Sequence, residues 1–213
     1  MDLAEMRRIY GLGELLESQV DPDPIVQFRT WLEQATDAGL NEPNAMVLAT
    51  ADGEGRPSAR TVLLKGLDAR GFVFYTNQQS HKADDLAANP HCALVFPWHA
   101  MERQVRVEGT VGKLPAAEVD AYFAGRPRES QLGAWASQQS RPVESREELD
   151  LQYASYERQW PEGTTISTPY FWGGYLVHPE RIEFWQGRIG RLHDRLSYRR
   201  TKSDSWELSR LQP

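Results

Sequence analysis

The sequence is poor in the features that mark secreted and membrane proteins. Its 213 residues include a single cysteine, Cys92, so no disulfide can form within the chain and a reducing compartment is favoured. No segment reaches the roughly 18 consecutive apolar residues that a membrane span needs. Residues 1–8 lack the apolar core of a secretory signal. We therefore expect a soluble, cytoplasmic protein with no membrane partner.

Signatures of nucleotide-binding and hydrolytic sites are also missing. The sequence has neither a Gly-x-Gly-x-x-Gly nor a Walker motif, and it has no Gly-x-Ser-x-Gly elbow. Its five histidines have no histidine four residues away and no cysteine pair, so no metal site is expected. They stand at positions 81, 91, 99, 178 and 193. An enzyme with this sequence would take its reactivity from an organic cofactor.

Negative charge predominates, but one segment is basic. The formal net charge is −6, which argues against a nucleic-acid partner. Between Arg181 and Arg200, however, six arginines face only two acids, Glu183 and Asp194. Such a cluster on an acidic chain is typical of a site for a small anionic ligand, and the alternative is a solvated, arginine-rich hairpin.

The N-terminal part divides into an arm and the start of a domain. Residues 1–22 are polar and aperiodic, which predicts an arm, and residues 23–213 are long enough for one domain. Asp23 and Pro24 are a suitable cap and first turn for a helix. The apolar stripe of that helix would be Phe28, Trp31, Leu32 and Ala35.

The rest of the sequence alternates between strand and helix patterns. Strands are predicted at 46–50, 58–65, 72–76, 92–98, 104–114, 171–177, 181–186, 195–200 and 206–211, with helices at 80–88 and within 115–159. Strands joined by short turns at this spacing indicate an antiparallel barrel. The predicted fold class is α+β, an antiparallel barrel with peripheral helices.

Two stretches place cations where a phosphate could bind. Arg60 and Lys65 lie five residues apart, on opposite faces of a regular strand unless a bulge aligns them. The alternative is that both face solvent. Lys82 follows Ser80 at the start of a predicted helix, and a helix N-terminus with a lysine can bind an anion.

Two further stretches carry groups suited to ligand binding. Tyr122, Arg126 and Ser130 are spaced by four and would clamp a phosphate if a helix continues or restarts at Pro127. Alternatively, Tyr122 belongs to the core and Arg126 pairs with Glu129. In the segment 184–195, an indole and an amide could contact a planar ring, while Arg191 and His193 alternate on one face of a strand. The alternative there is a structural tryptophan with a rim of charges.

These stretches, taken in order, resemble the pyridoxamine/pyridoxine 5′-phosphate oxidase family over nearly the whole chain. The motifs are Arg60–Lys65, Phe74–Asn77, Glu102–Gln104, Arg126–Ser130, Gly133–Trp135, Gln139–Ser140, Phe171–Gly174 and Arg191–Arg195. The resemblance implies an FMN-binding split β-barrel and a homodimer with FMN at the subunit interface. It also implies oxidation of pyridoxamine and pyridoxine 5′-phosphates to pyridoxal 5′-phosphate, with dioxygen reduced to hydrogen peroxide.

The resemblance also assigns roles to individual residues. The implied FMN site comprises Arg60, Thr61, Val62, Leu63, Leu64, Lys65, Tyr75, Thr76, His81, Lys82, Gln104, Gln139, Ser140, Trp185 and Arg195. The implied substrate site comprises Lys65, Tyr122, Arg126 and Ser130 at the phosphate, Arg191 and His193 at the pyridine ring, and Arg7 and Tyr10 as a lid. Arg191 and His193 are also the implied catalytic residues.

One position departs from the family pattern, and two rival functions remain. His81 stands where such proteins usually have arginine, which predicts weaker or more pH-dependent FMN binding.

A related flavin oxidase acting on a phenazine precursor is one rival function, and the stretches around Arg126 and Arg191 argue against it. A non-catalytic carrier of flavin or pyridoxal phosphate is the other.

Overall fold

The computed structural model describes residues 3–5 and 9–213, so the predicted lid residue Arg7 lies outside the described residues. Its helices are α1 (Pro24–Asp37), α2 (His81–Ala88), α3 (Ala116–Ala124), α4 (Arg128–Ala136) and α5 (Arg146–Gln159), with short 3₁₀ helices η1 (Leu3–Glu5), η2 (Glu17–Gln19), η3 (His99–Met101) and η4 (Ile189–Arg191). Its strands are β1 (Ala45–Ala51), β2 (Pro57–Leu63), β3 (Gly66–Asp68), β4 (Gly71–Asn77), β5 (His91–Trp98), β6 (Arg103–Lys113), β7 (Trp172–Gln186), β8 (Asp194–Arg200) and β9 (Trp206–Arg210).

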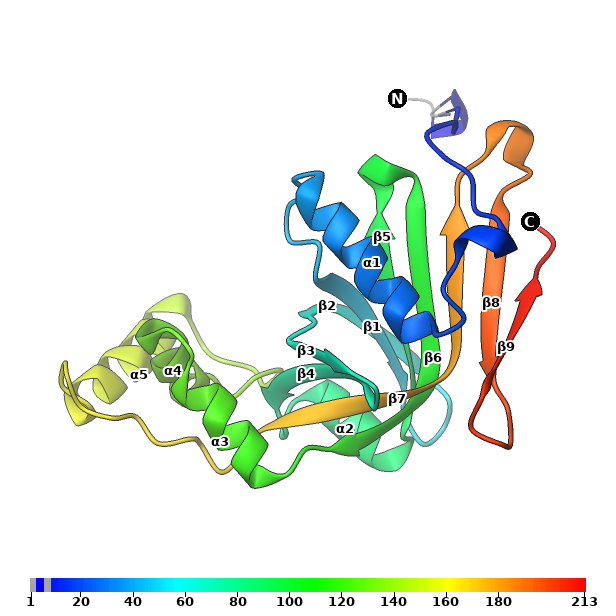
Figure 1. The fold of residues 1–213 in the computed structure, drawn as a ribbon. Helices are drawn as coiled ribbons and strands as arrows, with labels where there is room; N and C mark the ends of the chain where they lie inside the picture. The colour runs from blue at the N-terminus through cyan, green and yellow to red at the C-terminus, as the bar shows by residue number, and fades with distance from the viewer. Residues whose placement is uncertain (1–2, 6–8) are drawn as a thin grey trace.

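Helix α1 forms as the sequence predicts. The Asp23 carboxylate accepts a hydrogen bond from the backbone N–H of Ile25, and Pro24 occupies the first turn, where its missing N–H costs nothing. Phe28 and Trp31 on the predicted stripe are buried. In Figure 1 the helix lies across one face of the sheet, and this packing closes one side of the core.

The sheet divides along its longest strand. The described strands form one nine-stranded sheet in which β7 pairs with β6, β4 and β8. The first half of β7, Trp172–Val177, pairs with β4, while Arg181–Gln186 pairs with β8. Strand β7 therefore runs from the helical lobe of α3, α4 and α5 to the β8–β9 hairpin (Figure 1). This fork confirms the predicted α+β class with an antiparallel sheet and peripheral helices.

Two apolar clusters hold the chain together. The larger one joins α1 to the sheet and includes Phe28, Phe72 and Phe96, whose rings contact one another edge to face or tilted. The smaller one packs α3 and α4 against β7 through residues such as Phe123 and Trp172. Because Trp172 belongs to both the smaller cluster and a cavity wall, packing of the helical lobe also shapes the site.

The strand predictions were wrong at two places. Residues 171–177 and 181–186 were predicted as separate strands, but β7 is continuous through Pro179. The short strand β3 falls in a stretch predicted as a connection. The region 115–159, predicted to be helical, contains three helices.

Residues 3–5 and 9–213 offer neither a cluster of metal ligands nor a helix that could span a membrane. No three His, Cys, Asp or Glu side chains in this part of the chain lie where they could hold a metal ion. None of the helices in it is long and apolar enough to cross a membrane.

Candidate active site

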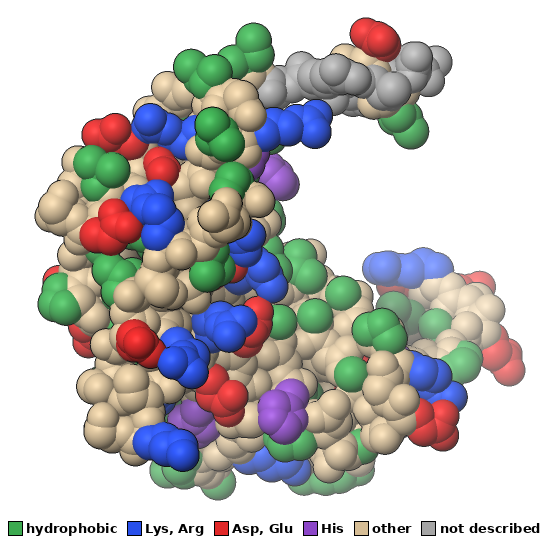
Figure 2. All heavy atoms as spheres, turned by 90° about the vertical axis from the view of Figure 1, so that its right-hand side faces the viewer, with side chains coloured by type: hydrophobic (Ala, Val, Ile, Leu, Met, Phe, Trp, Pro, Cys, Tyr) green, Lys and Arg blue, Asp and Glu red, His purple; other side chains and the backbone are tan. Residues whose placement is uncertain are grey.

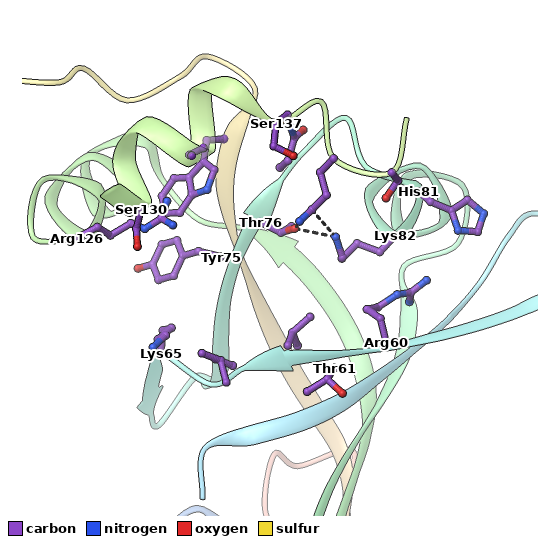
Figure 3. Close-up of a pocket in the computed structure, with 18 of the residues that line it drawn as sticks. Arg60, Thr61, Lys65, Tyr75, Thr76, His81, Lys82, Arg126, Ser130 and Ser137 are labelled. Carbon is purple, nitrogen blue, oxygen red and sulfur yellow. Dashed lines mark hydrogen bonds between the residues drawn. The ribbon is translucent and has the colours of Figure 1, made fainter. Parts of the chain in front are cut away.

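A cavity of about 790 Å³ opens between the β2 and β4 strands, the start of α2, and the α3–α4 lobe. Cations stand at its two ends (Figure 3): Arg60 and Lys82 at one, and Lys65 and Arg126 at the other. Strand β2 ends at Leu63, so Lys65 lies beyond the regular strand. The chain therefore brings Arg60 and Lys65 to one cavity, although a regular strand would separate them.

Lys82 is the most deeply buried cation of the cavity. Its side chain is buried on the first turn of α2, where Nζ donates to Thr76 Oγ1 at 2.9 Å, Ser80 Oγ at 3.0 Å and Gln139 Oε1 at 2.7 Å. All three acceptors are neutral. Burial, assisted by the positive charge of Arg60, lowers the pKa of the Lys82 ammonium to about 8. A buried ammonium without a carboxylate beside it favours an anionic ligand.

Arg60 stands beside Lys82 and is held by polar groups of the sheet. Its Nη1 donates to Thr50 Oγ1 at 2.7 Å, and its Nη2 donates to Ser58 Oγ. The Asp85 carboxylate lies 3.7 Å from Nη2. Burial lowers the pKa of Arg60 and Asp85 opposes that shift, but an arginine remains charged.

Aromatic rings form the wall near the other end. Tyr75 stacks on Tyr122 with ring centroids 3.8 Å apart, and Trp172 lies parallel to both. Gly174 allows this arrangement, because a Cβ there would lie 2.8 Å from the Tyr75 ring. The predicted clamp residue Tyr122 thus takes part in packing and also faces the cavity.

Arg126 follows α3, and its guanidinium lies over Trp172 at 4.8 Å from the ring centroid. Its Nη1 is buried and has no hydrogen-bond partner in the described chain. Burial lowers its pKa from the usual value. Ser130, on the helix α4 that restarts after Pro127, lines the same end of the cavity. A phosphate at this end would pair with the guanidinium of Arg126.

A second cluster of predicted residues lies outside this cavity. The rings of Tyr10, Trp185 and His193 contact one another with centroids 4.7–5.7 Å apart. His193 Nδ1 accepts the backbone N–H of Arg188 at 3.0 Å, so a neutral His193 carries its hydrogen on Nε2. Tyr10, Gln104 and Trp185 line a separate hollow. Within one chain, the predicted FMN residues are therefore divided between two places.

Glu102 fixes the N-terminal arm over this second cluster. Its carboxylate oxygen Oε2 accepts the backbone N–H groups of Gly11 at 2.7 Å and Leu12 at 3.0 Å. Gly187 leaves space for the arm, because a Cβ there would lie 2.8 Å from the Tyr10 ring. These contacts place Tyr10 against Trp185.

We expect Gly187→Ala to displace the arm, because the added methyl group overlaps Tyr10 and overpacking typically costs about 1–3 kcal/mol. Limited proteolysis would then cut the arm faster, and the fluorescence of Trp185 would change. Gly53→Ala is the control, since its Cβ would meet only Ala88 at 3.6 Å. Equal proteolysis of the two variants would contradict this account of the arm.

The structure corrects the prediction that Arg191 and His193 share a strand face. Strand β8 begins at Asp194, and Arg191 is the last residue of η4 with a left-handed φ of 64°. Gly190 before it also has a positive φ, 69°. Both predicted catalytic residues therefore lie on the connection between β7 and β8, and Arg191 is exposed there.

The basic segment is largely neutralised within the fold. Arg195 makes a two-pronged ion pair with the buried Glu183, with contacts of 2.8 and 3.0 Å. The others with a carboxylate partner are Arg181 with Glu108, Arg188 with Glu14 and Asp194, Arg199 with Glu207, and Arg200 with Asp204. Figure 2 shows acidic and basic side chains interspersed on this face. These ion pairs lower the net positive charge of the segment, and the anion-binding role predicted for it, including that of Arg195 at the flavin, stays a prediction.

Most of the other predicted site residues line the cavity. The cavity is lined by Arg60, Thr61, Val62, Leu63, Lys65, Tyr75, Thr76, His81, Lys82, Tyr122, Arg126, Ser130, Gln139 and Ser140. Leu64 is buried in the main core instead. Sequence reasoning gave no role to Trp172 or Asp85. The pair of glycines after Trp172 was the available signal for close packing there, whereas nothing local distinguishes Asp85 from Asp84.

Two family models match the sequence. One, described as pyridoxamine 5′-phosphate oxidase, covers residues 32–159, and one described as the C-terminal dimerisation region of pyridoxine 5′-phosphate oxidase covers 172–213. Curated proteins named pyridoxine/pyridoxamine 5′-phosphate oxidase are similar over the whole chain. That of Rubrobacter xylanophilus is 62% identical over 100% of this chain and 97% of its own, and that of Salinibacter ruber is 55% identical over 99% of each.

Solved structures agree on the fold. PhzG from Burkholderia lata, solved with tetrahydrophenazine-1-carboxylic acid, has a TM-score of 0.88 at 30% identity and covers 95% of this chain and 100% of its own. A pyridoxamine 5′-phosphate oxidase-related, FMN-binding protein from Nostoc punctiforme has a TM-score of 0.72 at 18% identity and covers 87% of this chain and 97% of its own. These similarities confirm the predicted split-barrel fold.

Proposed function

The chain belongs to the pyridoxamine 5′-phosphate oxidase family, and we propose that it uses FMN to oxidise pyridoxamine and pyridoxine 5′-phosphates to pyridoxal 5′-phosphate. Dioxygen would accept the electrons and leave as hydrogen peroxide. The observation that carries this proposal is the presence of separate cationic ends in one cavity, at Lys82 and at Arg126. A flavin phosphate and a substrate phosphate each require such an end.

The residues at the Lys82 end fit the phosphate of FMN. The ammonium of Lys82 has only neutral acceptors around it, and Arg60 adds a second cation beside the N-terminus of α2. Thr76 and Gln139 contact Lys82 and would orient it toward the bound phosphate. When bound, the flavin supplies a two-electron acceptor that dioxygen reoxidises.

The opposite end fits the phosphate of the substrate. Arg126 would bind it through its guanidinium, with Ser130, Tyr122 and Lys65 completing the clamp. Fixing the phosphate would orient the pyridine ring so that its 4-substituent meets the cofactor. For the amine substrate, two electrons leave the carbon bearing nitrogen, and water then releases ammonia from the imine.

We further propose that two copies of the chain complete each site. Trp185, Gln104 and His193 lie outside the cavity of their own chain, and residues 172–213 match a dimerisation region. A homodimer would place this cluster over the cavity of the partner. There His193, with its hydrogen on Nε2, and Arg191 would position the reacting substituent.

The test is aerobic incubation of the FMN-loaded protein with pyridoxamine 5′-phosphate, following pyridoxal phosphate and peroxide together. Equal amounts of the two products are expected. A phenazine-type oxidase would instead form neither product from this pyridine substrate. Unphosphorylated pyridoxamine is the matched control for the phosphate, and it should be oxidised far more slowly. Flavin binding without either product would contradict the proposed reaction.

His81 is expected to limit flavin affinity. It lines the cavity beside Lys82, whereas an arginine at this position would bring a permanent charge and a planar fork of donors that matches a phosphate. We expect His81→Arg to bind FMN about threefold more tightly, the size of an exposed ion pair. Flavin fluorescence titration of the two proteins measures this difference, and identical affinities would refute it.

A further inference from the structure

Behind the Lys82 end of the cavity lies a buried carboxylate that the proposed reaction does not use. Asp85, on α2, is only 2% exposed and does not line the cavity. Its Oδ2 accepts the hydroxyl hydrogen of Thr50 at 2.6 Å. A buried carboxylate close to a phosphate site opposes phosphate binding by simple charge repulsion, so its position calls for a physical reason.

Thr50 connects this carboxylate to Arg60. The buried Thr50 hydroxyl accepts from Arg60 Nη1 at 2.7 Å while it donates to Asp85. Asp85 Oδ2 also lies 3.7 Å from Arg60 Nη2. The carboxylate and the hydroxyl together fix the guanidinium from behind, and its orientation toward the cavity therefore depends on both.

Asp85 also lies close to His81, a second side chain at this end of the cavity. Its other oxygen, Oδ1, lies 3.6 Å from His81 Nε2, one helical turn earlier. His81 Nδ1 in turn lies 3.5 Å from Ser58 Oγ, which accepts from Arg60. The basic side chains around Asp85 are thus Arg60 from β2 and His81 from α2, and both line the cavity.

We propose that Asp85, acting with Thr50, is a positioning residue for the flavin phosphate: it holds the side chains of Arg60 and His81 at the cavity wall, beside the place of the phosphate. This inference rests on the proposed function, because it takes FMN as the ligand of this end. Preorganised donors bind an anion more tightly than mobile ones because less side-chain entropy is lost on binding.

The two effects of Asp85 on affinity have opposite signs, and an isosteric substitution separates them. Asp85→Asn removes the negative charge and weakens the hold on Arg60. Charge repulsion alone predicts tighter FMN binding by the variant, whereas positioning predicts binding weaker by about tenfold, the range of one charge-assisted hydrogen bond. The measurement is FMN affinity by quenching of flavin fluorescence on the full-length protein.

Asp84→Asn is the matched control. Asp84 is the preceding residue on α2, its side chain is 53% exposed, and it pairs with Arg141 at 3.1 Å. Its substitution removes the same charge from the same helix, and the affinity should stay unchanged or rise slightly. Equal or tighter binding by Asp85→Asn would overturn the proposal.

Thr50 gives a second, independent test if Asp85→Asn fails to fold. Thr50→Val keeps the side-chain shape but removes the hydroxyl, so FMN binding should weaken, while Thr50→Ser should restore it. Circular dichroism checks the fold of each variant. Wild-type protein that binds no FMN would refute the proposed function itself. Normal wild-type binding with unchanged Thr50→Val affinity would refute only the positioning role.

Discussion

Replacing Arg126 with leucine is expected to lower kcat/KM for pyridoxamine 5′-phosphate by about 100- to 1,000-fold. Truncating one partner of a buried, hydrogen-bonded charge pair typically costs about 2–5 kcal/mol, and each 1.4 kcal/mol is about tenfold. Because the phosphate lies far from the reacting carbon, most of the loss should appear in KM. Steady-state kinetics of the FMN-loaded variant measures both constants.

The unphosphorylated substrate separates a phosphate contact from a general defect. Pyridoxamine lacks the group that Arg126 would bind, so wild type and Arg126→Leu should oxidise it at similar rates. Arg126→Lys keeps the positive charge but loses the planar guanidinium. Its kcat/KM for pyridoxamine 5′-phosphate should therefore lie between the values of wild type and Arg126→Leu. An equal loss on both substrates would show that Arg126 does not act through the phosphate.

Arg126→Leu should not destabilise the protein. In the described chain the Nη1 atom is buried without a partner, and burying a polar group without a hydrogen bond is unfavourable. We therefore expect the melting temperature of the ligand-free variant to equal or exceed that of wild type. This result would also show that the kinetic loss does not come from unfolding.

Replacing Lys82 with methionine is expected to weaken FMN binding by about 30- to 100-fold. The ammonium belongs to the most deeply buried cation that lines the cavity, and a hydrogen bond to a charged group contributes about 1.5–3 kcal/mol. Methionine fills much of the same volume, so the packing of α2 should persist. Lys202→Met, in the exposed turn before β9, is the control and should bind FMN as wild type does.

The same lysine predicts how affinity changes with pH. In the free protein the Lys82 ammonium has a pKa of about 8 because it is buried and lies near Arg60. A bound phosphate favours the charged amine and raises this pKa, so binding takes up a proton once the free lysine is neutral. Above about pH 6, where the phosphate has lost its second proton, affinity should therefore stay nearly constant up to about pH 8 and fall as the pH rises further. In Lys82→Met the decrease of FMN affinity at high pH should disappear. If the variant kept the pH dependence of wild type, Lys82 would not be its cause.

Local patterns in the sequence predict most of the fold. The helical stripe through Phe28 and Trp31 identifies α1, because a helix that covers a sheet must bury one face. The alternation of Val105 and Val107 identifies β6 for the equivalent reason in a strand. The continuity of β7 through Pro179 was missed, since a proline within a run of strand residues usually marks an interruption.

The residues of the cavity could be predicted from the sequence where one short segment supplies several of them. Residues brought together from distant segments were harder to predict. Tyr122, Arg126 and Ser130 come together because α4 restarts soon after α3. The Arg191 prediction assumed a strand, but consecutive left-handed residues at Gly190 and Arg191 form a turn. Gly190 was the available signal for a left-handed backbone conformation. No local pattern in the sequence predicts that the arginine after it adopts a positive φ as well.

The ion-pair partners of the other charged residues depend on how the strands pair. Arg195 reaches Glu183 because Trp185 is opposite Arg195, which makes Glu183 its diagonal neighbour. That register depends on the connection between β7 and β8, whose conformation the sequence does not reveal. The contact of Asp85 with Thr50 could not be predicted from local sequence either, because it requires α2 to pack against β1.

The most direct test of the central claim is a single turnover without oxygen. The FMN-loaded protein is mixed anaerobically with pyridoxamine 5′-phosphate while flavin absorbance and pyridoxal phosphate are recorded, and air is then admitted. We predict that the flavin bleaches as one pyridoxal phosphate forms per flavin, and that its colour returns with release of one peroxide. A flavin that stays oxidised in the presence of excess substrate would contradict the account.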